Sequence, residues 1–168
     1  MAAAQLGHAV EFKSKIDEVD AQLMARRRAD DCSRRLAKIP GIGPISAMLL
    51  TMKTLAPELF RSGRQFAAWI GLTPRDHSTA GKVRLGVITR AGDEGLRSLL
   101  VIGATTVIQH ARRHGKASPW LGALLKRKSP KSAAVAVANK MARIAWNLML
   151  TGEAYTAMPA PATLAGAA

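Results

Sequence analysis

A turn rich in glycine and proline is the first feature of this sequence that suits the binding of a ligand. The run Ile39-Pro40-Gly41-Ile42-Gly43-Pro44 separates two segments with helical character. Glycine adopts positive φ angles that strain other residues, so the two glycines favour a tight turn, and Pro44 suits the first turn of a helix. The pattern is typical of a helix-hairpin-helix. The amides of such a turn, with the helix N-terminus behind it, can bind a phosphate.

The charge of the chain indicates a polyanionic partner. Its 168 residues include 25 Lys and Arg against 11 Asp and Glu, a formal net charge of +14. No acidic residue lies between Glu94 and Glu153, whereas ordinary surfaces mix both signs of charge. We therefore expect DNA backbone contacts along the chain, from Lys38, Gly41, Gly43, Lys82, Arg84, Arg90, Arg97, Arg112, Arg113, Lys126, Arg127 and Lys128.

The remaining composition favours a cytoplasmic protein. Cys32 is the only cysteine, so no disulfide can form within the chain, which fits a reducing compartment. The first residues lack the charged and apolar regions of a secretory signal, and no apolar run is long enough to span a membrane.

The spacing of apolar residues predicts an all-α fold. One long helix is expected over residues 8–35, as a coiled-coil arm, the tail of an upstream domain, or the first helix of a bundle. We divide the chain into a helical arm at 1–35, a domain at 36–155 with the helix-hairpin-helix at 36–54, and a disordered tail at 156–168.

Capping residues place the other helices. They are expected over residues 44–53, from Ser62 or Gly63 to Trp69, from the Gly92-Asp93-Glu94-Gly95 run to His114, over 119–125, and over 130–150. The glycine-rich segment from Gly71 to Gly92 is predicted to be a long irregular loop that could contain a short hairpin. A connection of this length in a compact domain is usually functional.

Residues 60–155 resemble the insertion-sequence one-ten transposases, most closely their eleven-eleven subgroup, which is related to the Piv invertase. The hairpin and the helix before it also match, so the resemblance covers nearly all of the chain except the tail. The matching segments are 68–75, 77–82, 84–86, 89–93, 96–97, 99–100, 139–146 and 152–155.

The resemblance implies a transposase that exchanges DNA strands through a serine. The family joins a nuclease-like domain bearing four carboxylates to a C-terminal domain, and this sequence resembles the second part. Its matching nucleophile is Ser78, in His77-Ser78-Thr79-Ala80-Gly81-Lys82. Family members often have Ser-Ser-Gly-Gly or Ser-Thr-Gly-Gly here, which leaves Thr79 as the alternative. Lys82, Arg84 and Arg90 would neutralise charge on the reacting phosphate.

The acidic residues of the sequence do not replace the four carboxylates. Asp17, Glu18 and Asp20 lie on the predicted arm, and Asp93 and Glu94 look like helix-start residues. We expect no metal site in this chain, and Mg²⁺ only with the nuclease-like domain. Two histidines at helical spacing, His110 and His114, are expected on a solvated face, and Trp69, Trp120 and Trp146 as core anchors.

The resemblance also sets the expected partners. They are DNA, a structured guide RNA that selects DNA sites in some family members, and further copies of the chain, since strand exchange needs several active sites held together. A bacterial, nucleoid-associated location follows. The competing hypothesis is a fragment that binds nucleic acid without catalysis.

Overall fold

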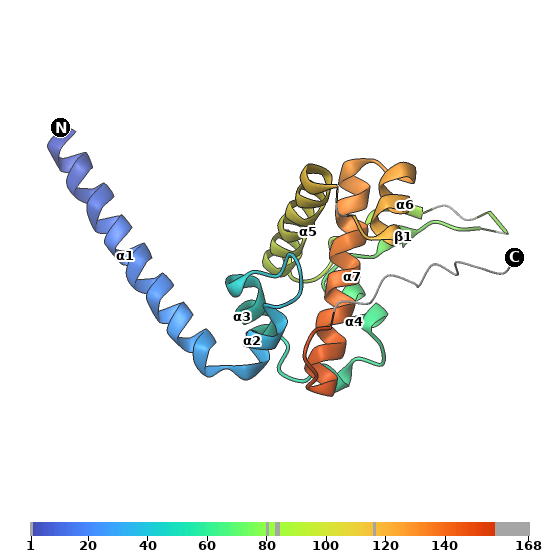
Figure 1. Ribbon diagram of the computed structural model, residues 1–168, viewed down its shortest axis with the longest axis horizontal. Coiled ribbons are helices and arrows are strands. Elements are labelled where there is room, and N and C mark those ends of the chain that lie inside the picture. Colours follow the sequence, from blue (N-terminus) through green and yellow to red (C-terminus); the bar gives the residue numbers. More distant parts are fainter. Residues whose placement is uncertain (1, 80, 83–84, 116, 157–168) are drawn as a thin grey trace, which may run out of the picture.

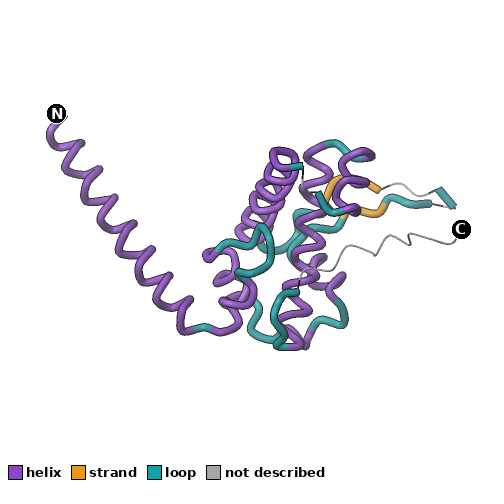
Figure 2. The backbone as a smooth tube through the Cα atoms, in the orientation of Figure 1, coloured by secondary structure: helices purple, strands orange, loops and turns teal. Residues whose placement is uncertain are grey.

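The body of the protein is built around two long helices that lie side by side. The structure, a computed structural model, describes residues 2–79, 81–82, 85–115 and 117–156. In Figure 1, α5 (Glu94–His114) and α7 (Pro130–Thr151) run together through the centre. Figure 2 shows that helices dominate and that the only strands drawn form one small hairpin. All but Thr156 of the predicted disordered tail, 156–168, lies outside the described residues.

The predicted N-terminal helix is two helices. α1 (Ala2–Ala29) projects away from the body (Figure 1), and α2 (Asp31–Leu36) begins after Asp30. The Asp30 carboxylate accepts hydrogen bonds from the backbone N–H groups of Cys32 (3.1 Å) and Ser33 (3.2 Å). Because an N-cap residue has extended backbone, this cap interrupts the helix, and the prediction of one helix to residue 35 is wrong.

α1 carries an apolar stripe that nothing in the described chain covers. Phe12, Ile16 and Val19 recur at intervals of four and three residues, which places them on one face of the helix. They are 65%, 60% and 53% exposed. The coiled-coil arm and the tail of another domain both remain compatible with this stripe.

The turn after α2 is anchored to the central helices. Ile39 and Ile42 are buried, and α3 (Pro44–Lys53) begins and ends where the sequence predicts. Gly41 has a φ of +86°, but Gly43 has an ordinary φ of −77°, so only one of the two glycines uses positive φ. A Cβ atom on Gly103 of α5 would lie 1.9 Å from the Gly41 carbonyl oxygen. The turn therefore packs backbone against backbone on α5.

The remaining helices begin at the predicted caps. The 3₁₀ helix η1 (Pro57–Leu59) leads into α4 (Gly63–Trp69), whose cap Ser62 accepts a hydrogen bond from the Gln65 N–H (3.3 Å). α6 (Pro119–Arg127) is short and packs on α7. The buried alanines of α7 let its neighbours approach closely, and a Cβ on Gly63 would already lie 3.1 Å from the Trp146 ring.

The predicted irregular loop contains a β-hairpin, so the all-α prediction is corrected to a mostly helical fold with two strands. β1 (Pro74–Asp76) pairs antiparallel with β2 (Leu85–Ile88), Pro74 opposite Ile88 and Asp76 opposite Leu85. The ends of the segment explain the hairpin. Cβ atoms on Gly71 and Gly92 would lie 2.0 Å from the Ala91 oxygen and 1.8 Å from the Trp69 oxygen. Because the two ends of the segment from Gly71 to Gly92 are in contact, the chain between them must reverse direction, as a hairpin does.

Within the described ranges, the structure contains no helix with the length and apolar character needed to cross a membrane.

Candidate functional site

Ser78 lies on the exposed segment that follows β1, and Asp76 holds it. The Ser78 N–H donates a hydrogen bond to Asp76 Oδ1 (2.8 Å). The pKa of Asp76 is lowered, first by a hydrogen bond from the Ser78 side chain and then by this backbone hydrogen bond. The carboxylate is therefore charged at neutral pH and accepts both donors of Ser78. An Asp that binds the chain two residues later is a common turn device, so the Asp-His-Ser spacing could have identified Asp76, which the sequence analysis missed.

The tip beyond Ser78 is narrow and open. Thr79 and Lys82 exchange two backbone hydrogen bonds, of 3.3 and 3.0 Å. Gly81 has a φ of +86°, and a Cβ there would meet no atom within 4 Å. A large ligand could therefore approach the backbone at this tip.

His77 does not provide a base for Ser78 in this arrangement. Its ring lies against the opposite strand, because a Cβ on Gly86 would lie 2.9 Å from His77 Cδ2. Ser78 donates hydrogen bonds to the Asp76 carboxylate.

Cations from three elements meet beneath the hairpin. Arg90 follows β2 with a φ of +54°, an uncommon conformation for a residue other than glycine. With Lys128 at the end of α6 and Lys131 in the first turn of α7, it lines a hollow of ≈ 720 Å³. The structure therefore brings together two residues of the predicted phosphate-binding set, Arg90 and Lys128, and adds Lys131.

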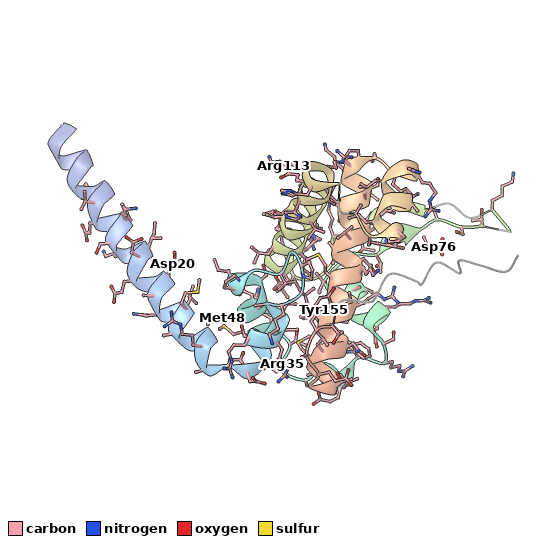
Figure 3. The ribbon with its side chains drawn as sticks, viewed as in Figure 1. Asp20, Arg35, Met48, Asp76, Arg113 and Tyr155 are labelled. Carbon is pink, nitrogen blue, oxygen red and sulfur yellow. The ribbon has the colours of Figure 1, made fainter. Side chains whose placement is uncertain are left out.

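Other residues of that set lie apart. Lys82 is exposed at the hairpin tip, and Arg84 lies outside the described residues. Arg112 and Arg113 are exposed in the last turn of α5, and Figure 3 shows Arg113 at that end of α5 and Asp76 on the hairpin. The exposed Lys126 and Arg127 end α6.

Arg97 has a packing role in this structure. The residue is only 9% exposed, and its Nη1 donates a hydrogen bond to the Ile70 carbonyl oxygen (3.1 Å) at the end of α4. A guanidinium in this position stabilises the helix C-terminus, where carbonyl groups lack partners. It is not presented to a ligand on the surface, contrary to the expectation for Arg97.

The helix-hairpin-helix retains only part of the predicted phosphate cradle. Gly41 is half-buried against α5, whereas Gly43 is exposed and begins α3 without a side-chain cap. The exposed Lys38 lines the neighbouring hollow of ≈ 540 Å³. The first amides of α3 have no partner within the helix, so Gly43, Lys38 and this helix end are the accessible part of the predicted cradle.

Asp93 serves as a helix cap and an ion-pair partner. Asp93 is the N-cap of α5 and accepts a hydrogen bond from the Leu96 N–H (2.8 Å), which lowers its pKa, and it also pairs with Lys53. Among the described residues, no group of three or more His, Cys, Asp or Glu side chains could hold a metal ion. The donors that Mg²⁺ prefers are therefore not gathered in the described part of the chain.

Comparison with known proteins decides the family. The model of the "Transposase IS116/IS110/IS902 family" matches residues 33–118, which is over half of the chain. The chain belongs to this transposase family. The match begins in α2 and includes the helix-hairpin-helix, the hairpin with Ser78 and all of α5. The resemblance inferred from the sequence is confirmed.

Individual members of the family are similar over most of this chain. The y4pF/y4sB protein of Sinorhizobium fredii, named as a transposase, is 65% identical over 86% of the chain and 38% of its own length. A protein of Pseudomonas aeruginosa named as a family 20 transposase is 44% identical over 86% and 43%. The transposase for insertion sequence element IS1328 of Yersinia enterocolitica is 38% identical over 84% and 43%. The chain thus spans about two fifths of the length of these relatives.

Proposed function

We propose that this chain is the DNA-binding C-terminal part of an insertion-sequence transposase. It acts in DNA transposition by serine-mediated strand exchange, together with a nuclease-like domain that supplies carboxylates and metal. The observation that carries the proposal is Ser78, which is exposed on the family-matched hairpin and held by Asp76. The greater length of the relatives leaves room for the second domain.

In the proposed reaction the Ser78 Oγ attacks the phosphorus of a DNA phosphodiester. An Oγ–P bond forms, and one bond between phosphorus and a sugar oxygen breaks. The hydroxyl proton is lost to water, and the departing sugar oxygen takes a proton from water. A carboxylate with a lowered pKa is a weak base, so Asp76 mainly positions the hydroxyl.

Cations of this chain would stabilise the reacting phosphate. Lys82 lies at the same tip as Ser78, and Arg90 lies at the base of the hairpin. Positive charges placed near the oxygens of a transferring phosphoryl group lower the barrier electrostatically. Mg²⁺ would be held by the carboxylates of the nuclease-like domain, because the described side chains of this chain do not converge on a metal site.

Trapping of a covalent protein–DNA adduct tests the proposal. The full chain is mixed with transposon-end DNA and Mg²⁺, with the nuclease-like domain of a longer relative added. We expect an adduct that Ser78→Ala abolishes and that Ser98→Ala, a change at an exposed serine of α5, leaves intact. Loss in Thr79→Ala with retention in Ser78→Ala would move the nucleophile to Thr79. No adduct under any condition contradicts the catalytic proposal.

The competing function is nucleic-acid binding without catalysis, and the lack of a carboxylate cluster among the described residues favours it for the chain alone. Backbone binding through several phosphates should weaken by roughly 10³-fold between low and moderately high salt. Salt-dependent binding without an adduct in any mixture would establish this alternative.

Self-association and guide RNA are further parts of the proposal. Pairing of the Phe12, Ile16 and Val19 stripe with the same stripe of a second copy would bury the exposed apolar surface of α1. Light scattering after chromatography should then give a larger mass for the wild type than for Ile16→Glu. A structured RNA and a bacterial cytoplasmic location are proposed from the family alone.

A further inference from the structure

Trp120 differs from the other two tryptophans in its ring contacts more than in exposure, since Trp69 is also 37% exposed. Trp69 stacks on Phe66 with ring centroids 5.6 Å apart, and the Trp146 Nε1 donates a hydrogen bond to the Pro57 oxygen (2.9 Å). These contacts fit the expected anchoring role. Trp120 is 41% exposed, and its ring contact is with the Lys140 Nζ, 4.1 Å from the ring centroid. It is thus an accessible indole beside a cation, not a core residue.

Trp120 lines a hollow between α4, α6 and α7. The hollow has a volume of ≈ 810 Å³ and contains Arg64 from α4 and Lys140 and Arg143 from α7. Its base is well packed, because a Cβ on Gly63 would lie 3.2 Å from the Arg143 Cβ. The positions of these side chains are therefore set by helices in direct contact.

The hollow is positively charged, and no acidic residue in its lining neutralises that charge. Its lining contains no Asp or Glu. Within the described residues, Arg64, Lys140 and Arg143 form no ion pair with an acidic residue. Guanidinium groups without carboxylate partners are suited to phosphate oxygens, which they can bind through two N–H groups.

This hollow continues toward the hairpin. Ala136 and Asn139 of α7 line both it and the hollow that contains Arg90, Lys128 and Lys131. Asn139 lies at the junction and donates a hydrogen bond to the Leu72 oxygen (3.3 Å) just before β1. The two hollows adjoin along α7, and we call the pair the groove. Its lining contains six cations and no acidic residue, and Trp120 lies in the hollow farther from the hairpin.

We infer that this groove binds an unpaired DNA strand. A base stacks on the exposed surface of Trp120, and backbone phosphates lie on Arg64 and Arg143. Inside a duplex the faces of the bases are covered by their neighbours, so an indole stacks far more readily on an unpaired base. A basic groove with an aromatic platform is the combination that binds single strands without sequence preference. The inference rests on the proposed DNA-binding function and specifies the form of the DNA.

The test measures the binding of a labelled dT oligomer of about 15 nucleotides, and of a duplex, to the full chain. Trp120→Leu should weaken dT binding about tenfold or more and duplex binding less than twofold. It should also remove most of the quenching of tryptophan fluorescence by dT. Arg64→Gln with Arg143→Gln should reduce the slope of log affinity against log salt by about 1.4 for dT. Both arginines are exposed, so the double variant should fold.

Matched variants make the outcomes decisive. Arg26→Gln with Arg28→Gln removes the same charge at exposed positions of α1, outside the groove, and should leave the slope for dT unchanged. An equal loss in both double variants would overturn the inference, as would dT affinity that Trp120→Leu does not change. Tighter binding of an oligo-U of the same length would overturn the assignment to DNA. The adduct assay of Ser78→Ala is separate, so groove binding without an adduct would refute only the catalytic proposal.

Discussion

The turn at residues 39–43 and the hairpin tip at Gly81 and Lys82 both turn at a glycine, but their surroundings are opposite. Gly41 is so close to α5 that a Cβ on it would lie 2.8 Å from the Gly103 oxygen, whereas a Cβ on Gly81 would meet no atom within 4 Å. Both glycines have a φ of +86°. The same local conformation therefore serves close packing in one region and exposure in the other.

The exposed hairpin is nevertheless fixed at its base. Gly71 and Gly92 approach the backbone across the segment, and the Thr89 N–H donates to the Thr73 oxygen (2.9 Å). Arg97 holds the end of α4 at the same place. The tip, open around Gly81, is thus carried on a tightly packed base, which suits the proposed attack of Ser78 on DNA.

The largest loss of stability is expected at the buried contact between Gly103 of α5 and the Gly41 oxygen. Gly103→Ala places a methyl group where the Gly41 oxygen lies, and we expect it to lower the free energy of unfolding by about 3 kcal/mol. Gly122→Ala is the matched control inside α6, where a Cβ meets no atom within 4 Å, and it should stabilise by about 0.5–1 kcal/mol. Urea unfolding of both variants measures this. Equal effects would show that the two backbones are not in contact.

Removal of the cation that holds the hairpin base should have the next largest effect. Arg97→Met leaves the Ile70 oxygen without its side-chain donor, and we expect a loss of about 2 kcal/mol. Arg112→Met, on the exposed end of the same helix, should change stability by less than about 0.5 kcal/mol. Thermal unfolding compares the two. If Arg97→Met loses DNA affinity without losing stability, Arg97 binds ligand and the packing role is wrong.

The exposed tip should tolerate the same glycine substitution at a smaller loss. Gly81→Ala meets no steric obstacle, so only the positive φ angle opposes it, at about 1 kcal/mol. Urea unfolding should therefore show a loss about one third of that for Gly103→Ala. A loss as large as that of Gly103→Ala would mean that the tip is packed in solution.

The smallest expected effect depends on pH. Asp93 follows the hairpin segment and pairs with Lys53 of α3, which follows the buried turn, so it connects the two regions. Its pKa is lowered in the native state, chiefly by the Leu96 N–H and then by Lys53. Its contribution is therefore present above the unfolded pKa, about 3.9, and is lost as the pH falls through the lower native pKa.

Asp93→Asn tests this contribution. Asn retains the helix cap but not the ion pair, so we expect a loss below about 1 kcal/mol at pH 7 that disappears in acid. Urea unfolding at pH 7 and near pH 2 measures the change. A difference that persists in acid would contradict the assignment to the carboxylate charge.

The sequence predicted the helices best where capping is local. Pro44, Ser62, Asp93, Pro119 and Pro130 each mark a helix start through their own side chain or ring, and the structure confirms those starts. The family could also be identified from the sequence, because many residues of the hairpin region match those of the family in the same order.

The features that the sequence did not predict, or left open as it did the short hairpin, depend on contacts between distant residues. The hairpin follows from the crossing of Gly71 and Gly92, and the burial of Arg97 follows from the position of Ile70. The exposure of Trp120 depends on how α6 lies on α7. The break at Asp30 was the exception, since its cap is local and the Asp-Asp pair was available as a signal.

The free surface of α1 has a consequence for hydrogen exchange. From Val10 to Gln22 every side chain is exposed, and among the described elements α1 contacts mainly α2 and α3, near its end. Its amides should therefore exchange with solvent through local fraying, as in an isolated helix. The amides of α5 and α7 should exchange only through global unfolding. Any partner that covers α1 would be detected, amide by amide, as slowed exchange along this one helix.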